Sequence, residues 1–171
     1  MVDRMIVLVG MPGSGKSTVG AILASSLGVP FIDSDRIIME KDGRRLQEII
    51  DEEGLDYFMA LEEKALLSLD DSMKVVATGG SAVLSEHGMA YLSSIATIVF
   101  LDVDIYMLTH RLANAQKRGI VIAKNQTIIS LYHERKPYYQ RYADIRIRPR
   151  NSRPRAVAEQ IILAVEGRNT K

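Results

Sequence analysis

The most restrictive feature of this chain is a glycine-rich segment, Gly10-Met11-Pro12-Gly13-Ser14-Gly15-Lys16-Ser17. It has the spacing of a phosphate-binding P-loop, follows an apolar run over residues 5–9 and precedes a helical pattern. Glycines in such a loop let successive backbone N–H groups turn towards one anion, and the first turn of the next helix adds its dipole. The segment therefore predicts a strand, a phosphate cradle and a helix, in that order.

The loop also predicts which cofactors bind. Lys16 can reach the β- and γ-phosphate oxygens of ATP as a compact positive charge, and the hydroxyl of Ser17 suits Mg²⁺. The expected nucleotide contacts are Gly13, Ser14, Gly15, Lys16, Ser17 and Thr18. A glycine turn with a surface lysine is the plainer alternative, and the strand and helix that flank the segment argue against it.

Length and charge narrow the class of protein. The 171 residues are 47% hydrophobic, which suits one domain spanning residues 1–171. A net charge of +1 gives no general attraction to nucleic acid, and the apolar runs are too short to cross a membrane. The absence of cysteine is compatible with a reducing compartment. We therefore expect a cytoplasmic monomer whose partner is a small hydroxylated molecule, with neither nucleic acid nor membrane as a partner.

Short apolar runs alternate with helical patterns along the whole chain. Strands are expected over residues 5–9, 31–32, 74–77, 95–101 and 145–147. Helices are expected from Lys16 to a stop at Gly28, and over 47–52, 57–69, 86–94, 105–115, 127–142 and 155–166. This alternation indicates right-handed crossovers onto a mostly parallel sheet, so the fold class is α/β. Residues 116–125, between two helices, are the expected lid.

Acidic residues and glycines follow the expected strands. Asp33 and Asp35 come after the second strand, and Gly79-Gly80 after the third, at the edge where open α/β sheets bind ligands. One carboxylate can hold a magnesium-bound water while the other accepts a proton from the acceptor hydroxyl; Asp33 suits the first role and Asp35 the second. The alternative is that either aspartate caps a helix beginning at Arg36.

Together these features resemble the shikimate kinase family over nearly the whole chain. The resemblance rests on the P-loop, the Asp33-x-Asp35 pair, Gly79-Gly80, and Arg135-Lys136-Pro137-Tyr138 before Ala143-Asp144. It implies a P-loop NTPase three-layer sandwich with a five-stranded parallel sheet in the order 2-3-1-4-5 and a lid that closes over ATP. It also implies ATP-dependent phosphorylation of a hydroxyl on a cyclic polyol acid, shikimate.

The resemblance assigns roles residue by residue on the acceptor side. It implies that Asp33 assists Mg²⁺ and that Asp35 contacts the acceptor hydroxyls and acts as the base. It further implies that Gly79 and Gly80 offer backbone amides to the acceptor, and that Arg135 holds its carboxylate.

On the nucleotide side, the resemblance implies that Arg118 approaches the transferring phosphate from the lid. It also implies that Arg111 and Pro154 sandwich the adenine.

The chain departs from the family pattern at three positions. Met59 stands where the family's Phe-Arg-x-x-Glu motif places a second carboxylate-binding arginine, Ser81 replaces a third glycine, and Gly119 replaces a proline after the lid arginine. Losing one arginine of the pair removes a charge-assisted hydrogen bond of about 1.5–3 kcal/mol. Arg44 or Arg45 could substitute for it, or the acceptor could carry different polar groups near Met59.

Other functions are compatible with parts of the pattern. A gluconate kinase-like enzyme would keep the chemistry and change the acceptor, and an adenylate-type kinase would bind a second nucleotide. A non-catalytic ATP-dependent switch would leave Asp35 without a purpose. The aspartate pair and Gly79-Gly80 favour the shikimate kinase type.

Overall fold

The computed structural model describes residues 4–72, 74–113, 127–149 and 153–169. Its five-stranded sheet has the order β2-β3-β1-β4-β5, and every neighbouring pair is parallel. The strands are β1 (Met5–Val9), β2 (Phe31–Asp33), β3 (Val75–Ala77), β4 (Ala96–Leu101) and β5 (Ile145–Ile147). The α/β class and the strand order expected from the sequence are confirmed.

Helices follow the strands as expected, with two additions, the helix over Ser34–Asp42 and the 3₁₀ turn over Ala82–Leu84. The helical elements are α1 (Lys16–Leu27), α2 (Ser34–Asp42), α3 (Leu46–Glu53), α4 (Leu55–Leu67), the 3₁₀ turn η1 (Ala82–Leu84), α5 (Glu86–Ile95), α6 (Ile105–Ala113), α7 (Ile128–Tyr142) and α8 (Pro154–Asn169). The sequence analysis considered α2 only as the helix that an aspartate would cap. None of the described helices is long and apolar enough to cross a bilayer.

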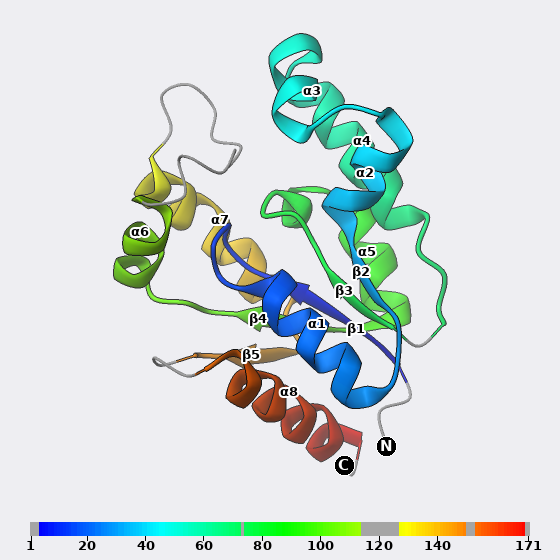
Figure 1. The fold of residues 1–171 in the computed structure, drawn as a ribbon, viewed down its shortest axis with the longest axis vertical. Helices are drawn as coiled ribbons and strands as arrows, with labels where there is room; N and C mark the ends of the chain where they lie inside the picture. The colour runs from blue at the N-terminus through cyan, green and yellow to red at the C-terminus, as the bar shows by residue number, and fades with distance from the viewer. Residues whose placement is uncertain (1–3, 73, 114–126, 150–152, 170–171) are drawn as a thin grey trace.

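The alternating pattern of β1 divides the core into two parts. Ile6 and Leu8 point to the face covered by α1 and α8, which lie side by side in Figure 1. Met5, Val7 and Val9 point to the other face, where residues of α5 and α7 pack against them. Each of these fully buried side chains contributes about 1.5–3 kcal/mol of hydrophobic stabilisation. The result is a three-layer sandwich that holds the carboxyl ends of the strands at one edge.

A smaller cluster lies under α2, α3 and α4, with Ile38, Ile49 and Phe58 buried at its centre. Arg44 joins the end of α2 to α3 through ion pairs with Asp42, at 2.7 Å, and with two glutamates of α3. These helices stand beyond the β2 edge of the sheet in Figure 1 and form one wall of the candidate site.

Candidate active site

The P-loop adopts the backbone that its glycines permit. Gly13 and Gly15 have φ values of 75° and 95°, in the left-handed region that favours glycine. Gly15 is the N-cap of α1 and no side chain caps this helix, so the first-turn N–H groups remain available to an anion. The loop therefore has the shape of a phosphate cradle.

The backbone of the P-loop holds the side-chain amine of Lys16 in place. Its Nζ donates hydrogen bonds to the carbonyl oxygens of Gly10, at 2.8 Å, and Met11, at 2.9 Å. Burial lowers the pKa of Lys16 to about 8, while the carboxylates of Asp35 and Asp33 act in the opposite direction. A phosphate next to this amine would favour its charged form.

Asp33 caps a helix, which was the alternative considered in the sequence, and it also bonds to Ser17 of the P-loop. Its Oδ1 accepts a hydrogen bond from the Asp35 N–H at 3.1 Å and caps α2, which begins at Ser34 rather than Arg36. Its Oδ2 accepts a hydrogen bond from the Ser17 hydroxyl at 2.7 Å. The structure thus joins the P-loop to the helix that carries Asp35, and it brings two oxygen ligands of the kind that Mg²⁺ prefers to one point.

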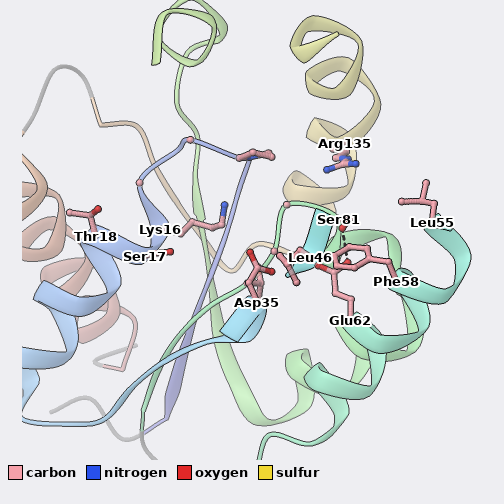
Figure 2. A pocket seen from close by; sticks show the side chains of 16 residues that line it. Lys16, Ser17, Thr18, Asp35, Leu46, Leu55, Phe58, Glu62, Ser81 and Arg135 are labelled. Carbon is pink, nitrogen blue, oxygen red and sulfur yellow. Dashed lines mark hydrogen bonds between the residues drawn. The ribbon is translucent and has the colours of Figure 1, made fainter. Parts of the chain in front are cut away.

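A cavity of about 350 Å³ opens beside Lys16. Figure 2 shows Lys16 and Asp35 on one side of it, Glu62, Phe58 and Ser81 on the other, and Arg135 extending from α7. The complete lining is Pro12, Gly13, Gly15, Lys16, Ser17, Thr18, Asp35, Leu46, Leu55, Phe58, Glu62, Thr78, Gly79, Gly80, Ser81 and Arg135. The cavity therefore brings together the predicted phosphate loop, base, glycine rim and carboxylate-binding arginine.

Asp35 extends from the first turn of α2 into this cavity, and its Oδ1 is buried without a hydrogen-bond partner. Burial raises the pKa of Asp35 to about 6; the negative charge of Asp33 adds to the rise and Lys16 opposes it. The group is ionised at neutral pH, and its free oxygen can accept a proton from a bound hydroxyl.

Gly79 allows two carboxyl groups to approach each other. A Cβ atom at this position would overlap Glu62 Oε1 and would lie 2.8 Å from Asp35 Oδ1. The Gly79 N–H donates to Ser34 Oγ at 3.1 Å, so in this structure the amide expected to meet the acceptor is bonded within the fold. What Gly79 supplies to the cavity is space.

Gly80 lies at the same rim and is fixed from α7. Its carbonyl oxygen accepts a hydrogen bond from the Tyr139 hydroxyl at 2.5 Å, and a Cβ on Gly80 would meet the ring of Pro12 at 2.7 Å. Arg135, one helical turn before Tyr139, is buried and lines the cavity. Among the described residues of the lining, Lys16 and Arg135 are the cationic ones.

Glu62 is a residue of the site that the sequence analysis missed. It is 2% exposed, and its Oε2 accepts a hydrogen bond from the Ser81 hydroxyl at 2.6 Å, while Oε1 is buried without a partner. Burial raises the pKa of Glu62 to about 7, although the bond from Ser81 acts against the rise. A signal was present, because Glu62 ends the Phe58-x-x-x-Glu62 stretch in which Met59 was noted.

The remaining predicted residues lie around the P-loop or outside the described chain. Arg111 on α6 donates to the Gly13 carbonyl at 3.2 Å, and Pro154 is the exposed first residue of α8. Arg118 and the lid at 116–125 lie outside the described residues. Arg44, Arg45 and Met59 are not part of the cavity lining, and Arg44 is engaged in the ion pairs between α2 and α3.

Comparison with known proteins decides which family this arrangement represents. The family model for shikimate kinase matches residues 12–166. The chain belongs to the shikimate kinase family. It is accordingly an ATP-dependent phosphotransferase with a hydroxyl group as acceptor, and the resemblance noted in the sequence is confirmed.

Individual relatives match over nearly their full length. A shikimate kinase from Sulfurihydrogenibium sp. is 37% identical over 96% of this chain and 99% of the relative. One from Aquifex aeolicus is 32% identical over 95% and 96% of the two chains.

Solved structures give the same assignment. Shikimate kinase from Acinetobacter baumannii in complex with shikimate superimposes with a TM-score of 0.89 at 31% identity, covering 98% of this chain and 96% of that one. A gluconokinase from Sinorhizobium meliloti reaches a TM-score of 0.55 at 18% identity, which shows a shared fold only.

Proposed function

We propose that this protein transfers the γ-phosphoryl group of ATP to a hydroxyl of shikimate in the presence of Mg²⁺. The observation that carries the proposal is that Asp35, with a free carboxylate oxygen, and Arg135 line one cavity together with Lys16. A base, a cation for a carboxylate and a cation for the transferring phosphate are the groups that this reaction requires.

On the nucleotide side, we assign the phosphates to the backbone N–H groups over Gly13 to Thr18 and to the amine of Lys16. Ser17 and Asp33 would hold Mg²⁺, since their side-chain oxygens already meet at 2.7 Å and magnesium takes its other ligands from phosphates and water. The ion would neutralise charge on the phosphates. Arg111, placed against the P-loop, and Pro154 are assigned to the adenine, and Arg118 to the transferring phosphate.

On the acceptor side, Asp35 is assigned to the reacting hydroxyl. It would accept the hydroxyl proton as the oxygen attacks the γ-phosphorus, and it would hold that oxygen in line with the leaving group. Gly79 and Gly80 form the rim against which the acceptor lies, and Arg135 is assigned to its carboxylate.

A second acceptor class has a specific observation in its favour. Met59 replaces the expected arginine, and part of the cavity lining is apolar, with Leu46, Leu55 and Phe58. Another small polyol or hydroxy acid with less negative charge would fit this wall. A lid over 116–125, a monomeric state and a cytoplasmic location remain predictions.

The first experiment is a coupled assay of ATP turnover with Mg²⁺, using shikimate and a panel of polyols and hydroxy acids against a blank without acceptor. Saturable turnover with shikimate is the expected result. Turnover on another acceptor with none on shikimate would show that the second acceptor class is the correct one. If no acceptor raises the rate of ATP turnover above the blank, the proposed kinase function is refuted.

A further inference from the structure

Glu62 occupies an unusual position for a carboxyl group. It lies on the buried side of α4, with Phe58 one turn before it and Leu66 one turn after it. One oxygen is held by Ser81, and the other is buried without a partner next to Gly79. An unpaired buried carboxylate oxygen is costly unless something binds to it, and Glu62 is one of the residues that line the cavity.

The groups that act on Glu62 come from several elements around α4. Asp35 on α2 adds negative charge, while Lys16 on α1 and Arg135 on α7 add positive charge. Tyr139 on α7 is also close enough to be affected by Glu62, and burial together with that charge raises the pKa of Tyr139. Glu62 therefore lies between the proposed base and the proposed carboxylate-binding arginine.

The charge balance around an acceptor carboxylate depends on Glu62. Lys16 is assigned to the phosphates, which leaves Arg135 as the described cation for the acceptor. With Asp35 and Glu62 both ionised, the acceptor half of the cavity carries two negative charges against one positive charge. An anionic acceptor would then be repelled, and a proton on Glu62 would restore the balance.

We propose that Glu62 is a specificity-determining residue of the acceptor site: its Oε1 binds an acceptor hydroxyl, and it admits an acceptor carboxylate only when it carries a proton itself. The inference rests on the proposed function in one respect, that this cavity binds the acceptor. Met59 is the reason that Glu62 has this role here, because no arginine follows Phe58 to neutralise it.

This role predicts a specific link between pH and affinity. Because the pKa of Glu62 lies at about 7, the carboxyl loses its proton between pH 6 and pH 8. If only the protonated form accepts an anion, shikimate should bind about tenfold more tightly at pH 6 than at pH 8, with uptake of a proton. The methyl ester of shikimate has the same hydroxyls and no charge, so its affinity should change less than twofold.

The test is calorimetric titration of the protein with shikimate and with its methyl ester, at pH 6 and pH 8. Glu62→Gln keeps the shape of the side chain and cannot titrate, so its affinity for shikimate should be nearly the same at both pH values. Glu63→Gln is the matched control, since it makes the same change one residue later, where the carboxylate is bonded to Ser85 at 2.5 Å. This control should keep the tenfold dependence. Asp35 titrates in all three proteins, so a pH dependence that persists in Glu62→Gln belongs to Asp35 and not to Glu62.

A second variant tests the same idea without removing the carboxyl. Ser81→Ala deletes a hydrogen bond that favours ionised Glu62, so the pH at which shikimate affinity falls should move upwards.

Equal pH dependence in wild type and Glu62→Gln would overturn the proposal, as would equal dependence for acid and ester, or failure of both compounds to bind wild type. Turnover of shikimate without a Glu62-dependent pH effect would refute this inference alone. The pH effect without turnover would refute the proposed function alone.

Discussion

Replacing Asp35 with Asn should raise the stability of this protein and lower its activity. The pKa of Asp35 rises from 3.8 to about 6 in the fold, chiefly because the carboxyl is buried and secondly because of Asp33. At about 1.4 kcal/mol for each unit of pKa, this rise corresponds to about 3 kcal/mol of destabilisation when the group is ionised. Since the side chain is partly exposed, we expect about 1–3 kcal/mol in practice.

The sign follows from which state holds the proton. A carboxyl whose pKa is raised in the fold destabilises the protein little below pH 4 and fully above pH 6, because folding then confines a charge that water would solvate better. Asn has nearly the same shape and no charge. Asp35→Asn should therefore raise the melting temperature at pH 7.5 by about 2–10 °C, and by about a third of that at pH 4.5.

Activity should change in the opposite direction. Removal of a general base typically lowers kcat by about 10²–10⁴-fold, whereas ATP affinity should stay within about threefold because Asn leaves the P-loop intact. Thermal melts at both pH values, ATP titration and the coupled assay measure the three quantities. An equal change in melting temperature at both pH values would refute the argument from buried charge. A kcat within tenfold of wild type, or a parallel loss of ATP affinity, would refute the role as base.

Further substitutions test other parts of the site. Lys16→Ala should abolish acceptor-dependent ATP turnover in the coupled assay, because the γ-phosphate loses its principal cation; near-normal rates would contradict the phosphate assignment. Met59→Arg should strengthen shikimate binding at pH 7.5 by about ten- to hundredfold in calorimetry, and an unchanged affinity would show that position 59 does not reach the acceptor. Gly79→Ala should displace Glu62 and weaken acceptor binding at least tenfold, with ATP affinity within twofold by titration. Loss of both affinities together would indicate general damage to the fold.

Local signals in the sequence were sufficient to predict most of the architecture. The strands β1, β3 and β4 are short apolar runs, and α1 ends where Gly28 adopts the left-handed conformation. The helix α2 was not predicted as an element of its own because its apolar residues, Ile37 to Met39, are consecutive and form no stripe. Its start depends instead on the cap from Asp33, which the sequence offered only as an alternative to a role in the site.

The residues of the candidate site could be predicted where a motif fixes the backbone. They were harder to predict where tertiary packing determines which side chains meet. The spacing of the P-loop determines the positions of Lys16 and Ser17, so both lie where expected. Glu62 was missed because a glutamate in a helical pattern normally faces solvent. Its spacing from Phe58 places Glu62 on the buried stripe of α4. Only the fold shows that Ser81 and Gly79 lie against its carboxyl group.

The crowding around Gly79 also limits how acceptor preference can change in this protein. Any side chain at that position must first displace a carboxyl, so we expect variants there to weaken acceptor binding before they gain a new substrate. Positions 59 and 81 have no such restriction, because each already carries a side chain. Ser81 donates a hydrogen bond to Glu62, and Met59 lies three residues before Glu62 on α4. Selection for a different acceptor, in nature or in the laboratory, should therefore proceed through residues 59, 62 and 81, while Gly79 stays fixed.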